Sequence, residues 1–485
     1  MKLSAEQKKV IEYDKGFLNV AAGAGTGKTT VLIERIKYLM SYNYVLPENI
    51  LVLTYNKKNV YNLKKHFSNI KIMTFHGLST SILKKYSHLL KKKYNCEFKI
   101  MNESQTETII KTILKSDNEL FPYRGDFSNI KYTISKIKKN LINQNVLEEN
   151  ELFKKFFNKY SQYLQEYNLM DFDDLNKYAF QLLSDEYICD LYKDKYHYIL
   201  IDEVQDIDFY QYSIIKLLTQ NELFIFGDSN QSIYGFRGAK NIYIDLLVQE
   251  FNMETFYLKT NYRSSPLILE LANNLINYNY EPQDKDKYKL IPFVKGSSND
   301  KVLDYYFDNS FIENCYIAGT IKELIKNENY KYDDIVILFR KNYLMDSIKD
   351  KFFVNNIPYM TNKVEKSYYK KPDIETKIPP EIKKFLDDKL KECQKTKFKN
   401  KVLLSTIHQI KGLEFKVVFL VGFEQETFIN ELLHTIDIKE ERRLAYVAIT
   451  RAKERLYITV SKERMVYGNI MKMKPAIFLQ EMGIK

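Results

Sequence analysis

The chain has 485 residues, of which 45% are apolar and 14% aromatic, with 15 glycines and 10 prolines. A chain of this length is too long for a single hydrophobic core, and its composition excludes a disordered protein. We therefore expect two or three packed units. Lysine and arginine outnumber aspartate and glutamate by 74 to 62, and the formal net charge of +12 favours a polyanionic partner such as nucleic acid. Because most of this excess is lysine, compositional bias with solvated lysine faces is an equal alternative.

The four cysteines, at positions 96, 189, 315 and 393, lack the close spacing of a zinc site, an iron–sulfur cluster or a disulfide framework. The segment MKLSAEQKKV has no apolar core of the kind found in signal peptides, and no apolar run approaches the roughly 18 residues of a membrane span. We therefore expect a cytoplasmic protein without a membrane partner.

The first predicted element is a strand that leads into a glycine-rich turn. An apolar run at 17–21 precedes AGAGTGKTT and the amphipathic run VLIERIKYLM. In this context glycines let backbone N–H groups approach phosphates, Lys28 reaches the terminal phosphates, and the Thr29 hydroxyl can bind Mg²⁺. A chance match is the alternative, which the flanking strand and helix disfavour. The predicted ATP-binding residues are Ala22, Gly23, Ala24, Gly25, Thr26, Gly27, Lys28, Thr29 and Thr30.

Residues 81–185 have helical spacing of apolar residues, as in ETIIKTILK and FKKFFNKYSQYLQEY. This spacing predicts a helical insertion. The insertion contains the acidic run DFDDL at 171–175, for which metal binding is one interpretation. We prefer a structural or DNA-channel role because no partner ligands are visible nearby.

A second strand, YHYILIDEVQD, carries Asp202 and Glu203 to its C-terminal end, where parallel sheets present ligand-binding groups. Asp202 would bind Mg²⁺ directly or through water, and Glu203 would orient and deprotonate the water that attacks the γ-phosphate. The alternative is an acidic pair that only caps the next helix.

The segment LFIFGDSNQSIYGFRGA predicts a third strand followed by a long polar loop. Gln231 stands where its amide could sense the γ-phosphate, whereas Asp228 could be only a turn residue. The chain has only ten arginines, and six of them lie in or beside motifs, where a planar fork with permanent charge suits phosphate. Surface ion pairing is the alternative for each. These six are Arg237, Arg263, Arg340, Arg442, Arg443 and Arg451.

The order of these motifs resembles the superfamily 1 helicases typified by UvrD, Rep and PcrA. The resemblance covers nearly the entire chain and implies an α/β fold of two RecA-like P-loop domains with parallel sheets, which hydrolyse ATP between them with Mg²⁺. The matching segments, in order, are LSAEQKKVIEY, AGAGTGKT, DEVQD, GDSNQSIYGFRGA, LKTNYRSS, DIVILFR, STIHQIKGLEF and EERRLAYVAITRAKERL.

The resemblance also implies roles at the nucleotide. Gln7 would read the adenine, Tyr262 would stack on it, and Glu414 would hold the ribose, with Gly412 beside it. Arg263 and Arg451 would contact the γ-phosphate from the second motor domain when the domains close, so hydrolysis would be coupled to movement. The implied catalytic residues are Lys28, Asp202, Glu203, Gln231, Arg263 and Arg451, with Thr29 and Asp202 on Mg²⁺.

For single-stranded DNA the resemblance implies aromatic platforms. Such platforms grip any sequence because every base has a π-face. The family commonly has tryptophan where this chain has Phe236, and the chain contains no tryptophan. An ordinary core position is the alternative for each Tyr and Phe. The implied DNA-binding residues are Tyr55, Phe75, His76, Tyr234, Phe236, Arg237 and His408.

We predict a first motor domain at 1–80 and 186–260, interrupted by the helical insertion at 81–185. The second motor domain is predicted at 261–360 and 401–485. In UvrD-like proteins a large duplex-contacting domain interrupts the second motor domain, whereas residues 361–400 supply only a short, lysine-rich remnant.

The leading hypothesis is an ATP-dependent translocase and 3′→5′ helicase that acts on single-stranded DNA and at junctions between single strand and duplex, the direction resting on the resemblance alone. The rival is a helicase-like ATPase subunit that binds DNA and nucleotide to regulate a partner enzyme, for example in antiphage defence or repair. Such a protein partner would replace the missing insertion. The two hypotheses differ in whether the isolated protein displaces a strand. The doubled motor domains and DEVQD exclude a small-molecule P-loop kinase.

Overall fold

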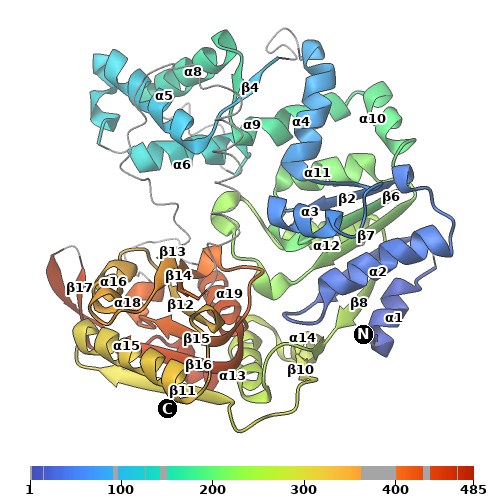
Figure 1. Cartoon of the computed structure of the whole chain (residues 1–485). Coiled ribbons are helices and arrows are strands. Elements are labelled where there is room, and N and C mark those ends of the chain that lie inside the picture. Colours follow the sequence, from blue (N-terminus) through green and yellow to red (C-terminus); the bar gives the residue numbers. More distant parts are fainter. Residues whose placement is uncertain are drawn as a thin grey trace, which may run out of the picture. The chain divides into compact units, whose positions relative to one another are not determined.

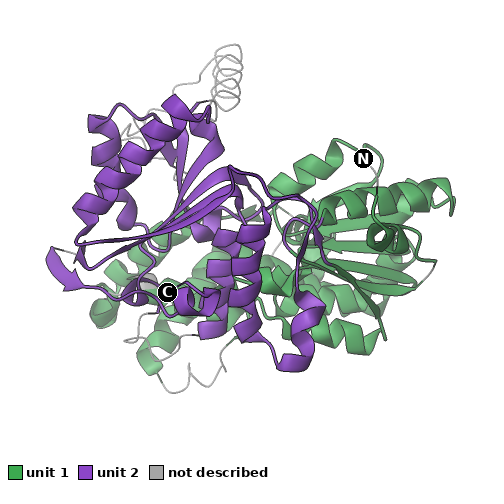
Figure 2. Ribbon diagram, turned by 90° about the horizontal axis from the view of Figure 1, so that it is seen from below, with its two compact units in different colours: residues 1–23, 27–258 green, residues 24–26, 259–485 purple. Residues whose placement is uncertain are grey.

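The computed structural model describes residues 3–14, 16–90, 97–125, 127–141, 150–361, 400–429, 437–466 and 468–484. They form two compact units, which Figure 2 shows in different colours: Met1–Gly23 with Gly27–Leu258, and Ala24–Thr26 with Lys259–Lys485. Three residues of the glycine-rich loop therefore group with the second unit. Each unit contains a six-stranded parallel sheet, which confirms the predicted α/β fold with two parallel-sheet domains.

The sheet of the first unit is buried on both faces. In β2 (Ile50–Thr54) every residue is buried, and the residues alternate: Ile50 and Val52 pack into one hydrophobic cluster, and Leu51 and Leu53 into another. This alternation explains the continuous apolar run, because a parallel strand covered by helices on both sides needs apolar side chains on both. In sheet order the strands are β3 (Lys71–Thr74), β2, β6 (Tyr198–Asp202), β7 (Glu222–Gly227), β1 (Phe17–Ala22) and β8 (Glu254–Leu258).

Two sets of helices supply the other halves of these clusters (Figure 1). The set that packs with Ile50 and Val52 is α1 (Ala5–Ile11), α2 (Lys28–Ser41) and α3 (Lys57–Lys64). The set that packs with Leu51 and Leu53 is α4 (Phe75–Tyr86), α9 (Phe172–Leu183), α10 (Glu186–Lys193), α11 (Phe209–Leu218) and α12 (Ile242–Glu250).

Between α4 and α9 the chain forms a helical region with a hydrophobic cluster of its own, which includes Ile110, Phe156 and Tyr160. Because α4 and α9 themselves belong to the core of the sheet, this separate cluster is built from residues 101–169. The boundaries at 81 and 185 stay a prediction. The region consists of β4 (Lys99–Ile100), α5 (Glu103–Ser116), the 3-10 helix η3 (Asn118–Tyr123), α6 (Phe127–Lys138), α8 (Glu151–Glu166) and β5 (Leu169–Met170).

The second unit has its own parallel sheet, in the order β11 (Lys301–Phe307), β16 (Ala452–Ser461), β15 (Phe415–Val421), β12 (Ile335–Phe339), β14 (Val402–Thr406) and β13 (Tyr359–Thr361). Its remaining strands are β9 (Thr260–Asn261), β10 (Ile291–Pro292), β17 (Glu463–Val466) and β18 (Asn469–Lys472). Its helices are α13 (Pro266–Ile276), α14 (Lys285–Tyr288), α15 (Ser310–Asn327), α16 (Leu344–Val354), α18 (Gln425–Phe428), α19 (Ile438–Ile449) and α20 (Phe478–Met482).

The predicted remnant insertion at 361–400 falls almost entirely on residues 362–399, which lie outside the described residues. Within the described ranges, no helix is long and apolar enough to cross a membrane.

Candidate nucleotide and DNA sites

Lys28, Asp202 and Glu203 meet at the C-terminal edge of the first sheet. Lys28 begins α2, and its Nζ lies 2.8 Å from a carboxylate oxygen of Glu203 and 4.0 Å from Oδ1 of Asp202. Glu203 follows β6 with φ 59° and ψ 44°. This left-handed conformation costs a non-glycine residue on the order of 1–3 kcal/mol and is found where a site needs a particular orientation. The predicted base and the predicted phosphate-binding lysine are thus neighbours.

Asp202 is 1% exposed, and burial raises its pKa to about 6. Its Oδ2 accepts hydrogen bonds from Asn59 Nδ2 at 3.1 Å and from Thr54 Oγ1 at 3.5 Å. Its Oδ1 lies 4.0 Å from Lys28 Nζ but accepts no hydrogen bond from the described residues, so this buried carboxylate oxygen can still bind a metal cation. The site therefore fits the predicted Mg²⁺. Asn59 and Thr54 were not predicted, although Thr54 ends the strand beside β6.

The predicted γ-phosphate sensor is joined to Glu203 through two other side chains. Gln231 Nε2 donates to Asp228 Oδ2 at 2.6 Å, and the backbone N–H of Asp228 donates to Gln205 Oε1 at 3.1 Å. Gln205 is fully buried and its Nε2 donates to Glu203. Gln205 was not predicted, although its place in DEVQD was a signal.

The glycine-rich loop lies against the predicted adenine reader. Gly27 has φ 81°, and a Cβ at this position would lie 2.9 Å from Nε2 of Gln7. The other end of the Gln7 amide accepts a hydrogen bond from the Ser4 N–H at 3.1 Å in the capping box of α1. Thr29 and Thr30 follow Lys28 in the first turn of α2.

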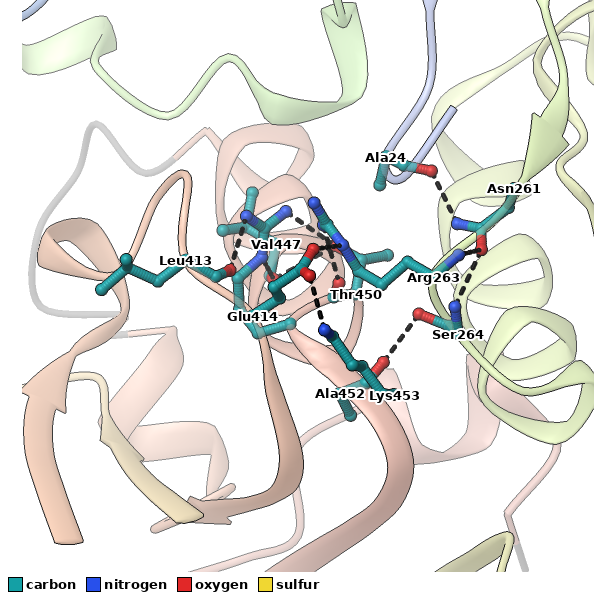
Figure 3. Close-up of polar contacts among 11 residues, drawn as sticks. Ala24, Asn261, Arg263, Ser264, Leu413, Glu414, Val447, Thr450, Ala452 and Lys453 are labelled. Atoms are coloured by element: carbon teal, nitrogen blue, oxygen red, sulfur yellow. Dashed lines mark hydrogen bonds and ion pairs between the residues drawn. The ribbon is translucent and has the colours of Figure 1, made fainter. Parts of the chain in front are cut away.

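In the second unit, Glu414 is held by two cations (Figure 3). Arg263 Nε lies 2.6 Å from one carboxylate oxygen, and Lys453 Nζ lies 2.5 Å from the other. Burial alone would raise the pKa of Glu414, but Lys453 and Arg263 hold this pKa below its usual value. The predicted ribose ligand therefore pairs with the predicted arginine. Lys453 was not predicted, because it is one lysine among many in this chain.

Arg451 is 1% exposed, and its guanidinium donates to the backbone carbonyls of Val447 at 3.0 Å and Leu413 at 3.3 Å. It thereby ties the end of α19 to the segment that holds Gly412, whose φ is 82°. Tyr262 lies against Phe293, with ring centroids 4.8 Å apart.

Four predicted DNA-binding residues of the first unit, Tyr55, His76, Phe236 and Arg237, line a cavity of about 520 Å³. Tyr55 and Tyr234 stack with centroids 5.3 Å apart and an interplanar angle of 20°. Arg237 donates to the Tyr55 hydroxyl at 3.2 Å and lies over the rings of Tyr234 and Phe236. Phe236 is 46% exposed. One side of the cavity therefore presents aromatic rings together with a permanent cation.

On another part of this cavity His76 meets Phe172 edge to face, with centroids 5.7 Å apart. Burial lowers the pKa of His76, so its ring is neutral at pH 7 and offers a flat surface rather than a charge. Phe75 is placed differently: it is 3% exposed and packs in the core with Leu78. The structure thus does not bring Phe75 to the cavity.

The three carboxylates of DFDDL are each paired with a lysine. Lys138 Nζ lies 2.6 Å from Asp171 and 2.7 Å from Asp174, and Lys139 lies 3.1 Å from Asp173. Asp171 also caps the N-terminus of α9. No group of three or more potential metal ligands occurs in the described part of the chain. These contacts support the structural interpretation of this run.

His408 lies in the second unit, in the 3-10 helix Ile407–Gln409 that follows β14, and lines a cavity of about 610 Å³. Arg340 lines the same cavity and forms a two-pronged ion pair with Glu441, at 2.9 and 2.6 Å. The other lining residues are Lys341, Asn342, Tyr343, Asp346 and Thr406.

Comparison with known proteins identifies two helicase domains along the chain. Residues 3–252 match the UvrD/REP helicase N-terminal domain, and residues 256–379 and 372–463 match the UvrD-like helicase C-terminal domain. DNA helicase II of Rickettsia typhi is 27% identical over 99% of this chain and 95% of its own length. ATP-dependent DNA helicase Rep of Buchnera aphidicola subsp. Schizaphis graminum is 26% identical over 99% and 96%, and ATP-dependent DNA helicase PcrA of Staphylococcus epidermidis is 26% identical over 99% and 86%.

The alignment with the Rickettsia protein runs over 629 positions, more than the 485 residues of this chain, so that relative carries residues with no counterpart here. The comparisons favour the helicase hypothesis over the regulatory-subunit alternative, because the matched proteins bear helicase names and both helicase domains are present. The chain belongs to the UvrD/Rep family of ATP-dependent DNA helicases.

Proposed function

We propose that the protein is a motor that moves 3′→5′ along single-stranded DNA and separates duplex at single-strand junctions, using ATP with Mg²⁺. The observation that carries this proposal is the meeting of Lys28, Asp202 and Glu203 behind a glycine-rich loop. The comparisons give no support to a separate protein partner, so the proposal includes none. The cytoplasmic location stays a prediction.

The proposed chemistry assigns Glu203 to the attacking water. Its left-handed backbone and its hydrogen bond from Gln205 fix the carboxylate, which lies 2.8 Å from Nζ of Lys28. Asp202 and the Thr29 hydroxyl would hold Mg²⁺, which would neutralise charge on the phosphate oxygens. Lys28 exchanges its contact with Glu203 for the terminal phosphates, which frees the carboxylate to accept a proton.

Arg263 and Arg451 are proposed to contact the terminal phosphate. Both carry a planar fork with a permanent charge, the geometry that phosphate recognition favours. Gln7 and Tyr262 serve the adenine, Glu414 the ribose, and the Gln231 amide, which donates to Asp228, senses the γ-phosphate. Each of these roles rests on the family resemblance together with the placement described above.

The proposed DNA grip rests on the cavity of the first unit and on Tyr234, which stacks on the lining residue Tyr55. Tyr55, Tyr234 and Phe236 supply rings, and stacking contributes roughly 1–3 kcal/mol per base without sequence preference. Arg237 adds a cation for the phosphate backbone. His76 adds a neutral ring, and His408 adds a contact in the second unit.

The proposal is tested by ATP hydrolysis with and without single-stranded DNA at several salt concentrations, because backbone binding weakens with salt. The purified protein is compared with Glu203→Gln and with Glu166→Gln, an exposed glutamate of α8 that serves as a matched control. We expect DNA to stimulate the wild type and the control, and hydrolysis to fall by about 10²-fold or more in Glu203→Gln. If single-stranded DNA did not stimulate hydrolysis by the wild type, the translocase proposal would be refuted.

Direction is tested on duplexes with one single-stranded tail. The proposed motor displaces the partner strand when the tail is 3′ and leaves a 5′-tailed duplex intact. Displacement from the 5′ tail alone would refute the proposed direction but not the ATP chemistry. DNA-stimulated hydrolysis without strand displacement on either duplex would refute unwinding and favour the regulatory-subunit alternative.

A further inference from the structure

Asn261 lies at the end of β9 and is fully buried, yet its side chain has no place in the assignments above. Its Nδ2 donates to the backbone carbonyl of Ala24 at 2.6 Å, and its Oδ1 accepts from the backbone N–H groups of Arg263 at 2.8 Å and Ser264 at 2.9 Å (Figure 3). A carbonyl needs a donor and two N–H groups need an acceptor, so these partners fix which end of the amide is nitrogen. One planar group thus joins two backbone segments that are 237 positions apart in the chain.

The loop is shaped to accept this side chain. Gly25 has φ 68°, and a Cβ there would lie 2.6 Å from Nδ2 of Asn261 and 2.8 Å from Cβ of Arg263. The N–H of Tyr262 donates to the carbonyl of Gly25 at 2.9 Å. Glycine is therefore required at position 25 by the approach of the segment 261–263, in addition to any ligand.

These contacts set the direction of two loop N–H groups. In a trans peptide the C=O and the following N–H point in opposite directions, so anchoring the carbonyl of Ala24 orients the N–H of Gly25. In the same way, anchoring the carbonyl of Gly25 orients the N–H of Thr26. Loop N–H groups of this kind bind phosphate only when their carbonyls are turned away from it.

The acceptor half of Asn261 acts on the arginine. Its Oδ1 holds the N–H of Arg263 in a turn that starts α13, and the Arg263 guanidinium leaves this turn toward Glu414. A serine could supply that turn, because its hydroxyl accepts from nearby N–H groups. Only a longer side chain with a donor at its end also reaches Ala24.

We propose that Asn261 is a positioning residue of the nucleotide site, which holds the phosphate-binding N–H groups at Gly25 and Thr26 and the backbone of Arg263 in one fixed arrangement. This inference rests on the proposed function, in which the loop binds phosphate and Arg263 contacts the terminal phosphate. The amide does not touch the reacting atoms; it acts through the backbone of residues that do.

The test compares Asn261→Ser and Asn261→Asp with the wild-type protein. Serine keeps a neutral acceptor for the turn but cannot reach Ala24, and aspartate keeps the shape and the acceptor Oδ1 but replaces the donor by a second, charged oxygen. We expect each to weaken binding of a fluorescent ATP analogue without DNA, or to lower kcat for DNA-stimulated hydrolysis, by about tenfold, the effect of one unsatisfied buried carbonyl. The split between affinity and kcat is recorded for each variant.

Asn273→Ala is the matched control. Asn273 of α13 is also buried, and its amide also bridges backbone groups, donating to the carbonyl of Leu290 and accepting from its N–H, both at 2.9 Å. We expect the control to lower Tm while nucleotide affinity and kcat of the folded protein stay at the wild-type level. A merely structural Asn261 would behave like this control, and that result would overturn the proposal.

Two further outcomes are informative. A loss in Asn261→Asp with wild-type behaviour in Asn261→Ser would assign the effect to the added charge and overturn the proposal. Wild-type hydrolysis that ignores DNA would refute the motor, yet the affinity of the variants for the ATP analogue would still decide the role of Asn261. A wild-type chain that binds no nucleotide would overturn both.

Discussion

Two ionic clusters of the second unit use the same residue types at opposite degrees of burial. Arg464 is 3% exposed and pairs with Glu424 and Glu313, which are both 0% exposed. Arg263 is 18% exposed and shares Glu414 with Lys453, which are 42% and 36% exposed. Removing one member of a buried cluster leaves its partners as buried charges without water or a counter-ion, which is costly. Partly exposed charges can change partner at little cost, because water solvates them. The first cluster therefore fixes the fold, and the second is suited to exchange a carboxylate for a phosphate.

The largest expected effect comes from removing the exchangeable arginine. Arg263→Ala should lower kcat for ATP hydrolysis by roughly 10³- to 10⁵-fold, the contribution of an arginine that stabilises charge on a transferring phosphoryl group. Its Tm should change little, because an ion pair of this exposure is weak. Steady-state hydrolysis and thermal melting measure the two effects, with Arg124→Ala of the first unit as control. Unchanged hydrolysis would remove Arg263 from the site.

The buried cluster should show the opposite pattern. Arg464 links β17 to Glu424 after β15, at 2.7 and 2.8 Å, and to Glu313 of α15 at 2.8 Å. Arg464→Ala leaves two buried carboxylates without their cation and should lower the free energy of unfolding by about 3–5 kcal/mol, measured by urea denaturation. The neighbouring Lys462→Ala, which breaks only the exposed pair with Asp308, should have little effect. Equal losses in both variants would contradict the distinction by burial.

Both clusters use residues far apart in sequence, which marks the limit of sequence-based prediction here. The fold class and the carboxylates at the end of β6 follow from local patterns, a strand before a glycine-rich loop and a strand that ends in DE. The contact of Asn261 with Ala24 and that of Lys453 with Glu414 depend on how separate segments pack. No local pattern contains that information.

The position of each residue around helix α4 explains why one predicted DNA-binding residue, Phe75, lies in the core. In α4, Phe75 lies on the same face as Leu78 and Ile82, three and seven positions on, and all three are buried. The neighbouring His76 falls on a different face and lines the cavity of the first unit. The spacing of the apolar residues in FHGLSTSILKKY separates these two faces of the helix, whereas the aromatic character that Phe75 and His76 share does not.

A third cluster, in the first unit, extends the comparison to pH. Lys138 bridges Asp171 and Asp174, and burial raises the pKa of Asp174 from 3.8 to about 7, while Lys138 holds the pKa of Asp171 below its usual value despite burial. A carboxyl whose pKa is raised by folding binds its proton more tightly in the folded chain, so its stabilising contribution is full below about pH 4 and is lost as pH rises to about 7. This carboxyl thus opposes folding once it is ionised.

The pH prediction is tested with Asp174→Asn, which keeps an acceptor for Lys138 but cannot ionise. The Tm of the wild type minus that of the variant should fall as pH rises from about 4 to about 7 and stay constant above that range. Asp173→Asn is the control, since Asp173 pairs with Lys139 at the edge of the same cluster and is 22% exposed. A Tm difference that rises over this range would show that Asp174 is stabilised as a carboxylate.

The smallest expected effect tests the exchangeable cluster itself. Arg263 and Lys453 each contact one oxygen of Glu414, so each reduces the attraction between that carboxylate and the other cation. In Lys453→Gln the full charge of Glu414 faces Arg263, which must leave it to reach a phosphate. We expect kcat to fall by only a few fold, within the roughly 1 kcal/mol of an exposed pair, and the loss to shrink at high salt because screening weakens exposed pairs.

Lys416→Gln, which breaks the exposed contact with Asp334 at 3.3 Å, is the control and should leave kcat unchanged at every salt concentration. A faster Lys453→Gln variant would mean that the lysine competes with Arg263 for the phosphate and not for Glu414, which would reverse its role in the cluster.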